Sequence, residues 1–382
     1  MLLVCVKKGM NTPKGLGGGF ISIYFNKYYS SPSIAFETFK KSSAIAEAIN
    51  SDATLRVCLD VCNPAPSESD LQLAREEIER YVDEDYREAV RTGIPATLAA
   101  SNGLGWDENL WNSVLHSTAG VLHAINDVTS GTPVAASLSS GLHHATPSHG
   151  SGFCTINSVA LGALAAARGG LKVVILDLDA HCGGGTEAFL RKFPQEAEKI
   201  VHVDLSVIPF DRYEPRATGS WSRMATRDSY LADLDQALTM VLAEKPDLVI
   251  YNAGIDIWPT VDKQVVHERE TRVAQTIVSN GIGCVIVMAG GYGSDDDIVP
   301  LHLSTLQSFA RASSRAEEVK SLLAMSMTGP IPSIEPSSRT RIWAARARAG
   351  QDCRSRNRWN VIRGTIPTPF RPPNFYGWIN LD

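Results

Sequence analysis

The chain has 382 residues, of which 44% are hydrophobic and 20% charged, and its formal net charge is −5. This composition is ordinary for a globular protein, and the chain is long enough to bury a sizeable core. At about 150 residues per domain, the length alone suggests two or three domains.

The N-terminal segment and the cysteines indicate where in the cell the protein is expected. The apolar start Met1–Val6 is ended by Lys7 and Lys8, which makes it too short for a signal peptide or a membrane span. The seven cysteines include no C-x-x-C pair. An odd number of cysteines without a secretory signal is typical of reduced thiols, so we expect a cytoplasmic protein without membrane association.

Charge is distributed unevenly along the chain. The 62 residues from Ser321 hold nine arginines, no lysine and three acidic residues, so the excess of negative charge lies in residues 1–320. An acidic body argues against nucleic-acid binding there and is compatible with a cationic substrate. The tail is also rich in Pro and Ser and lacks a helical apolar period. It is typical of a disordered or irregular appendage, although its arginines could bind phosphate.

The predicted elements alternate between strand and helix. Helices are expected at residues 34–49, 69–90, 111–128, 153–167, 187–199, 228–243 and 267–279, the first with Ser33 as N-cap and the second with Ser67 or Ser69. Strands are expected at residues 132–138, 171–181, 199–206, 247–252 and 284–288.

This alternation runs without a linker from about residue 130 to 310. We therefore predict an α/β fold with one catalytic domain over residues 27–315, in which helices cover both faces of a central, mainly parallel sheet. Residues 1–26 show no clear pattern and are predicted to be irregular. Residues 316–382 are predicted to be an Arg/Pro-rich C-terminal extension, irregular or disordered.

Polar side chains end the apolar strand that begins at Leu171. Asp177, Asp179 and His181 stand at alternate positions, and because the side-chain period of an extended chain is two, all three point the same way. Burying two carboxylates and an imidazole together costs several kcal/mol unless a cation holds them. One such Asp could simply cap the next helix. Three in phase predict a divalent metal site, with zinc one of several candidates.

Other candidate residues follow other strands. In open parallel sheets, sites lie beyond the carboxyl ends of the strands. Asp256 would add a third metal ligand there, unless it only caps a turn. The pair His143 and His144 suits proton transfer, although an isolated His is more often structural. Tyr292 lies among glycines and could donate to a developing oxyanion, or be a packing residue.

Several segments together resemble a known family. They are similar to the signature blocks of zinc-dependent histone deacetylases and their bacterial relatives, including the acetoin-utilization type, within the arginase/deacetylase superfamily. The blocks stand in the family's order over residues 80–310, and jointly they are highly specific. They are Gly141-Leu-His-His-Ala145, Gly152-Phe-Cys-Thr-Ile-Asn-Ser158, Asp177-Leu-Asp-Ala-His-Cys-Gly-Gly-Gly-Thr186, Ala253-Gly-Ile-Asp256 and Ala289-Gly-Gly-Tyr292.

The resemblance implies an arginase/deacetylase-like fold and hydrolysis of an N-acyl amide. Matched by motif, Asp179, His181 and Asp256 would bind Zn²⁺ or Fe²⁺. His143 and His144 would transfer protons, with His143 oriented by Asp177, and Tyr292 would stabilise the tetrahedral intermediate. A structural K⁺ would be held by Asp177, Asp179, His181, Asp204 and Leu205.

The resemblance also implies a substrate tunnel. Phe153 and Tyr213 would wall the stem of an aliphatic acyl-amine, and Asp107 would lie at the rim. Gly152, Gly290 and Gly291 belong to the same substrate-binding blocks. The implied substrates are acetylated lysine in a peptide or protein, or a small acetylated amine. Nucleic acid is not an expected partner of the catalytic domain, and oligomerisation is left open.

The chain departs from the family pattern at several positions. Cys182 stands where the family often has a second His, and Gly184 where an Asn or Asp commonly orients the second His of the pair. Ser139-Ser140 replaces an Arg-Pro that commonly precedes that pair. The segment 257–266 is short, and the tail after about residue 315 matches nothing in the family.

Two other functions compete with deacetylation. A ureohydrolase such as arginase shares the sheet and an Asp-Ala-His element, but its two manganese ions need further carboxylates. One of these would fall at Gly183, and Asp256 has no partner at position 254 or 258. The other alternative is a catalytically silent protein that keeps the fold for interaction, with the Arg-rich tail as its docking element.

Overall fold

The computed structural model describes residues 21–29, 41–62 and 66–328. The chain divides into two compact units, Met1–Ser326 and Met327–Asp382. Nearly all of the second unit lies outside the described residues, and so do Ser33 and the start of the helix predicted at 34–49. Among the described helices, none is long and apolar enough to cross a membrane.

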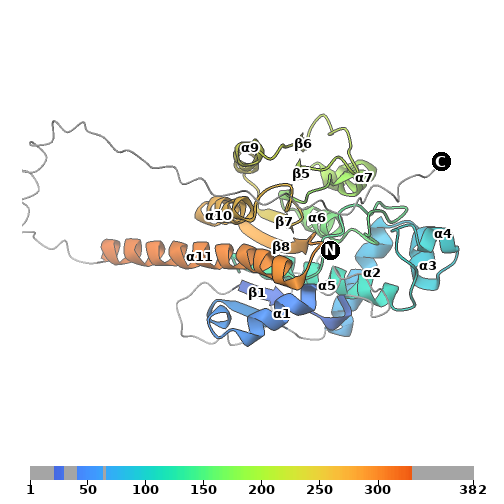
Figure 1. Cartoon of the computed structure of the whole chain (residues 1–382), viewed down its shortest axis with the longest axis horizontal. Helices are drawn as coiled ribbons and strands as arrows, with labels where there is room; N and C mark the ends of the chain where they lie inside the picture. The colour runs from blue at the N-terminus through green and yellow to red at the C-terminus, as the bar shows by residue number, and fades with distance from the viewer. Residues whose placement is uncertain (1–20, 30–40, 63–65, 329–382) are drawn as a thin grey trace, which may run out of the picture. The chain divides into compact units, whose positions relative to one another are not determined.

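Eight parallel strands form one sheet, which confirms the predicted α/β class (Figure 1). Their order is β2-β1-β3-β8-β7-β4-β5-β6, so the strands that precede the candidate site residues lie in the middle. The strands are β1 (Ile21–Tyr24), β2 (Leu59–Cys62), β3 (Val134–Ser137), β4 (Val173–Asp177), β5 (Ile200–Ser206), β6 (Ser220–Met224), β7 (Leu248–Gly254) and β8 (Gly283–Ala289).

Helices pack on both faces of this sheet and create two hydrophobic cores. One core contains side chains of α1 (Lys41–Ser51), α9 (Tyr230–Glu244), α10 (Lys263–Ser279) and α11 (Asp295–Thr328). The other contains side chains of α2 (Glu68–Tyr81), α3 (Glu84–Thr92), α5 (Leu110–Thr129), α6 (Ser158–Arg168) and α7 (Gly184–Lys192). The described residues also form two short helices, α4 (Ala96–Ala99) and α8 (Pro194–Ala197).

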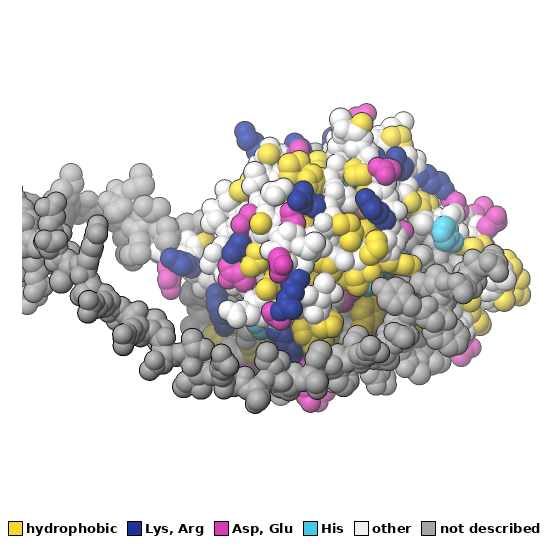
Figure 2. Space-filling view, turned by 45° about the horizontal axis from the view of Figure 1, so that its top comes forward, with side chains coloured by type: hydrophobic (Ala, Val, Ile, Leu, Met, Phe, Trp, Pro, Cys, Tyr) yellow, Lys and Arg dark blue, Asp and Glu magenta, His cyan; other side chains and the backbone are white. Residues whose placement is uncertain are grey.

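The apolar run in β4 follows from this two-sided packing. Val174 and Leu176 enter one core, while Val173 and Ile175 enter the other. Because successive side chains of a strand point to opposite faces, a strand covered on both sides must be apolar throughout. Outside the cores, acidic and basic side chains are interspersed over the face shown in Figure 2.

Three strands were not predicted, and all lie toward the sides of the sheet. β1 falls wholly inside the segment 1–26 that was predicted to be irregular, and β2 and β6 are the two outermost strands. An edge strand is covered less completely, so its sequence need not be a continuous apolar run. In β6, Ser220–Met224, no residue is fully buried.

Tertiary contacts also moved some helix boundaries. The helix predicted over 69–90 breaks at Val82, which has extended backbone angles, and the N–H of Asp83 donates to the carbonyl of Pro147 at 2.8 Å. Ser67 caps α2 as predicted, with a capping box to Asp70. The helix predicted from residue 153 begins at 158, because the side chain of Asn157 accepts the N–H of Ala160 as an N-cap.

The helix α11 was not predicted and continues past residue 315 to Thr328. Its first turn carries three acidic residues, Asp295 to Asp297, where the helix dipole favours negative charge. Its Leu306 and Phe309 are buried in the first core. The division into segments 1–26, 27–315 and 316–382 remains a prediction.

A buried arginine joins the ends of two central strands. Arg269, on α10, is fully buried, and its Nη1 donates to the carbonyls of Leu178 (2.9 Å) and Gly254 (2.6 Å). Its charge is balanced by Glu270, which also accepts a hydrogen bond from the hydroxyl of Tyr251 at 2.9 Å. These contacts fix the backbone beside Asp179 and just before Ile255.

Replacing this arginine should destabilise the fold strongly. In Arg269→Met, Glu270 would remain as a buried carboxylate without its cation, so the free energy of unfolding should fall by about 3–5 kcal/mol. The control is Arg272→Ala on the same helix, which breaks more exposed ion pairs with Asp235 and Glu268 and should cost less than about 1 kcal/mol. Urea unfolding measures the loss in each variant. Equal losses would contradict the role of Arg269 in holding the ends of the two strands.

Candidate metal centre and active site

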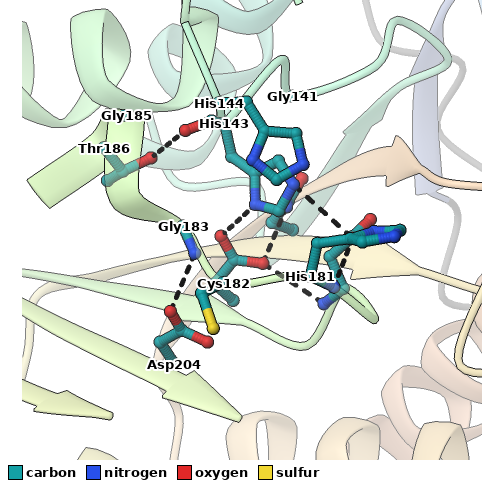
Figure 3. Close-up of polar contacts among 12 residues, drawn as sticks. Gly141, His143, His144, His181, Cys182, Gly183, Gly185, Thr186 and Asp204 are labelled. Atoms are coloured by element: carbon teal, nitrogen blue, oxygen red, sulfur yellow. Dashed lines mark hydrogen bonds and ion pairs between the residues drawn. The ribbon is translucent and has the colours of Figure 1, made fainter. Parts of the chain in front are cut away.

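The predicted site residues come together at the carboxyl ends of the central strands. His143 and His144 follow β3, Asp179 and His181 follow β4, Asp256 follows β7, and Tyr292 follows β8. Two sets of side chains offer ligand atoms within 4.8 Å of one another. One is Asp179, His181 and Asp256, and the other is His143, His144 and Asp179. Figure 3 shows the histidines beside the loop that leaves β4.

Asp179, His181 and Asp256 form the set with the chemistry of a divalent cation site. The Nδ1 atom of His181 lies 3.0 Å from Asp179 Oδ1 and 3.2 Å from Asp256 Oδ2. Backbone N–H groups hold both carboxylates, since Asp256 Oδ1 accepts from Ala180 and Asp179 Oδ1 from His181. Asp256 Oδ2 is buried and accepts no well-aligned hydrogen bond from any described residue.

The electrostatics of this set favour a bound cation. Burial, and then the neighbouring Asp179, raise the pKa of Asp256. Burial opposes the charged form of His181, but hydrogen bonds and charge interactions with Asp179 and Asp256 outweigh it and raise its pKa to about 10. Two buried carboxylates that disfavour each other's ionisation are stabilised together by a positive charge between them.

His143 forms a buried ion pair with Asp177. Its Nδ1 donates to Asp177 Oδ2 at 2.8 Å, and Asn252 Nδ2 donates to the other carboxylate oxygen at 2.8 Å. Asn252 is the register partner of Asp177 on β7, so the sheet itself places this amide. Burial opposes the charge, but Asp177 and Asp179 outweigh it and raise the pKa of His143 to about 10.

His144 has the opposite electrostatic character. Burial, and then the neighbouring His143, lower its pKa to about 4, although a hydrogen bond from Nδ1 to Asp211 Oδ2 (3.0 Å) opposes this. The two imidazole rings are only 3.9 Å apart. The pKa values of the two imidazoles are thus driven in opposite directions, which is the separation that acid and base roles need.

Tyr292 follows β8, and the charges of Asp256 and Asp179 act on its phenol. Its side chain is 42% exposed. Desolvation, and then the carboxylates of Asp256 and Asp179, raise the pKa of its phenol well above the ordinary value, so the hydroxyl keeps its proton and can donate it in a hydrogen bond. Gly290 passes so close to Asp256 that a Cβ there would overlap Oδ1. Gly291 has φ +94°, which favours glycine.

The residues predicted to line or flank a substrate tunnel lie in three separate loops. Gly152 is pressed against His144, and a Cβ there would lie 2.5 Å from His144 Cδ2 and 2.8 Å from Phe210 Cε1. Phe153 adopts φ +64°, and its N–H donates to the carbonyl of Asn102. Asp107 accepts the N–H of Asn109 just before α5.

Tyr213 packs against His202, and its role as a tunnel wall stays a prediction. Its ring stacks on His202 at 5.6 Å and its hydroxyl lies 3.2 Å from His202 Nδ1. Phe210 instead packs edge-on against His144 (4.9 Å) and His181 (6.0 Å). The two aromatic residues are three positions apart, and the chain turns between them at Asp211, whose φ is +59°.

Asp204 lies beside Asp177 in the register of β4 and β5. Its Oδ2 accepts the N–H of Gly183 at 2.8 Å (Figure 3), whereas its buried Oδ1 accepts no hydrogen bond from any described residue. Burial, and then Asp177, raise the pKa of Asp204 to about 6. The next residue, Leu205, points its side chain into the first core.

Two polar residues of the site were missed in the sequence. Asp211 falls in an irregular loop, and only its carboxyl group could have drawn attention to it. Lys41 is fully buried on α1, and its Nζ donates to the carbonyl of Gly290. Burial lowers the pKa of Lys41 to about 8, against the opposing effect of Asp256 and Asp179. A lone Lys in a helix carries no sequence signal of such a position.

A family model described as "Histone deacetylase domain" matches residues 36–299, more than half of the chain. The chain belongs to the histone deacetylase family. This match confirms the family resemblance of the signature blocks. Membership of the family supports the assignment of the protein as a deacetylase.

Proteins with different names are similar to this chain. An uncharacterized protein of Picosynechococcus sp. is 30% identical over 212 residues, covering 52% of this chain and 70% of the relative. Histone deacetylase 2 of Arabidopsis thaliana is 30% identical over 198 residues, covering 45% and 50%. Acetylpolyamine amidohydrolase of Burkholderia pseudomallei is 24% identical over 221 residues, covering 54% and 62%. The chain thus spans less than two thirds of both of these named enzymes.

A solved structure supports the fold. The crystal structure of acetylpolyamine aminohydrolase from Burkholderia pseudomallei matches with a TM-score of 0.59 at 18% identity, covering 76% of this chain and 99% of that one. At this identity the match shows the fold alone, and it confirms the arginase/deacetylase-like architecture.

The close approach of β7 to Asp179 gives a test of the site's packing. A Cβ on Gly254 would overlap Asp179 Cα, so Gly254→Ala should displace the Asp179 backbone and lower the free energy of unfolding by about 1–3 kcal/mol. Gly105→Ala is the control, because its Cβ would meet nothing within 4 Å, and it should change stability by less than about 0.5 kcal/mol. Thermal unfolding compares them, and an unaffected Gly254→Ala variant would contradict the packing described.

Proposed function

We propose that this protein is a metal-dependent deacetylase that hydrolyses the N-acetyl amide of lysine or a related amine. One observation carries the proposal: a set of two Asp and one His with ligand atoms suited to a cation shares Asp179 with a second group that contains His143 and His144. Membership of the histone deacetylase family supports the same reaction class. The physical support is that ligands for a cation and two histidines lie together, with the Tyr292 phenol close enough to be influenced by Asp256 and Asp179; amide hydrolysis uses groups of these kinds.

Asp179, His181 and Asp256 would hold one divalent cation, Zn²⁺ or Fe²⁺. The fit rests on the donor set and on the buried Asp256 Oδ2, which accepts no hydrogen bond from the described residues. When bound, such an ion polarises the acyl carbonyl and activates a water molecule for attack. Three protein ligands leave a coordination position open for this chemistry.

The two histidines would divide the proton transfers. Asp211 takes the Nδ1–H of His144, which leaves Nε2 of this neutral ring free to accept a proton from the attacking water. His143 is held as a cation by Asp177 and would protonate the leaving amine. Tyr292 would donate its hydroxyl hydrogen bond to the acyl oxygen as negative charge develops there.

The substrate would enter past the aromatic side chains. Phe153 and Phe210 would flank the aliphatic stem, with Gly152 making room beside His144. Asp107 would bind the substrate at the rim. The names of relatives provide two substrate classes, acetylated lysine of proteins and acetylpolyamines, and both are aliphatic amines that carry an acetyl group.

A monovalent cation would occupy a second site beneath the first. Asp204 supports a K⁺ there through its buried, unpaired Oδ1, with the backbone carbonyls of Asp177, Asp179, His181 and Leu205 as further ligands. A cytoplasmic location is also proposed, supported by the free thiols of Cys58, Cys154, Cys182 and Cys284.

The two alternatives are less well supported. The family assignment favours a deacetylase over a ureohydrolase, and Gly183 stands where a second manganese ion would need a carboxylate. A catalytically silent protein would have no use for two histidines whose pKa values are driven in opposite directions.

Metal content and turnover test this proposal together. The purified protein should contain one Zn²⁺ or Fe²⁺ per chain and deacetylate a fluorogenic acetyl-lysine peptide, N-acetylputrescine, or both. Asp179→Ala should lose metal and turnover together, because it removes one of three ligands. Asp235→Ala, an exposed aspartate on α9, should change neither. Two metal ions per chain by elemental analysis, or full occupancy in Asp179→Ala, would contradict the single-ion site.

The role of Tyr292 is tested by removing only its hydroxyl. Tyr292→Phe keeps the ring, so metal content and melting temperature should stay nearly unchanged. The single-turnover rate should fall by about 10²–10³-fold, because the lost hydrogen bond is strongest in the transition state. Substrate affinity should weaken much less. An active Phe variant with a slightly lower melting temperature would instead assign Tyr292 a packing role.

A further inference from the structure

His144 has a carboxylate partner although the usual position for one is a glycine. The family commonly has an Asn or Asp at the position of Gly184, and that residue orients the second His of the pair. Here the partner is Asp211, from the loop between β5 and β6, whose Oδ2 lies 3.0 Å from His144 Nδ1. It reaches the same imidazole from a segment 27 positions further along the chain.

Gly184 and Asp211 occupy the same space. A Cβ on Gly184 would overlap both Oδ1 and the carbonyl oxygen of Asp211. The nearest contacts of that Cβ are all with Asp211, so the room left by the glycine is filled by the aspartate. A side chain at position 184 and the observed Asp211 conformation therefore exclude each other, and one has replaced the other as the neighbour of His144.

The loop that carries Asp211 is fixed to the segment that carries the metal set. The N–H groups of Val207 and Ile208 donate to the carbonyl of Ala180, and the N–H of Cys182 donates to the carbonyl of Phe210 at 3.0 Å. Asp211 itself has φ +59°, a left-handed conformation that aspartate tolerates better than most residues. The backbone thus delivers its carboxylate to a defined place.

The carboxylate is also held by α7. Its Oδ2 accepts the N–H of Gly185, in the first turn of that helix, at 2.9 Å. Both hydrogen-bond partners of this oxygen, Gly185 N–H and His144 Nδ1, meet the carboxylate at the same atom as donors to it. An acceptor-only carboxylate then requires the hydrogen on Nδ1 of His144, which leaves Nε2 as the ring's acceptor.

We propose that Asp211 is the positioning residue of His144, and that it performs from the β5–β6 loop the task that position 184 has elsewhere in the family. It fixes the Nδ1–H tautomer and the orientation of the ring. The proposal rests on the proposed function, because the tautomer matters only if His144 accepts a proton.

The main experiment removes the orienting carboxylate and compares it with a variant that keeps an acceptor oxygen. In the zinc-loaded enzyme, Asp211→Ala should lower kcat on the fluorogenic acetyl-lysine peptide or N-acetylputrescine by about 10–100-fold, with KM and zinc content changed little. Asp211→Asn should keep most of the wild-type kcat, because its side-chain oxygen can accept from His144 Nδ1 and from Gly185 as Oδ2 does. Arg212→Ala, in the same loop, is the matched control and should keep wild-type kcat.

Asp211→Asn also guards against misfolding. Asparagine tolerates the left-handed conformation and keeps the hydrogen bond from Gly185, so its melting temperature should stay unchanged. Wild-type kcat in a folded Asp211→Ala variant would overturn the proposal. A loss of kcat that appears only together with a lower melting temperature, with the His144 tautomer unchanged, would make Asp211 a residue that holds the loop and would also overturn it.

A readout independent of turnover separates this inference from the proposed function. Long-range ¹⁵N NMR of labelled histidine in the zinc-loaded protein should report the Nδ1–H tautomer of His144 in the wild type, its loss in Asp211→Ala and its retention in Asp211→Asn. If the wild type deacetylates neither probe but shows this pattern, the proposed function fails and the positioning role stands. An unchanged tautomer in Asp211→Ala overturns the positioning role whatever the activity.

Discussion

Four buried aspartates at one edge of the sheet are the constraint to which the rest of the structure responds. Asp177, Asp179, Asp204 and Asp256 are all buried, and an isolated ionised carboxylate is not stable in a protein interior. Asp177 is satisfied by His143 and Asn252. Asp204 and Asp256 each keep one buried oxygen without a hydrogen bond from any described residue. This edge of the sheet therefore gathers carboxylate oxygens that bound cations would stabilise.

Positive charge reaches this edge from both nearby loops and distant helices. His143 comes from a segment at a strand end, and its pKa is raised because the carboxylates outweigh its burial. Lys41 arrives from α1 and Arg269 from α10, and both donate to backbone carbonyls beside the carboxylates. Helices on one face of the sheet thus stabilise a site built by the strands.

Glycines make the close approach of these segments possible. A Cβ on Gly183 would lie 2.7 Å from Asp177 Oδ2, one on Gly254 would overlap the Asp179 backbone, and one on Gly290 would overlap Asp256. The glycine-rich ends of β4, β7 and β8 are therefore packing requirements of the carboxylate cluster. Gly184 belongs to the same group but serves a different neighbour, since its missing side chain admits Asp211 beside His144.

The sequence by itself determined the alternation of buried strands and helices and the placement of polar residues at strand ends. Both depend on local periodicity, and a strand covered on two faces must be apolar whatever surrounds it. Tertiary structure alone decided which loop residue meets a given ring. Phe210, not Tyr213, packs on His144, and Asp211 bonds to it, because hydrogen bonds tie residues 207–210 to the segment 180–182. The break at Val82 and the edge strands β2 and β6 depend on partners distant in the chain, which no local pattern contains.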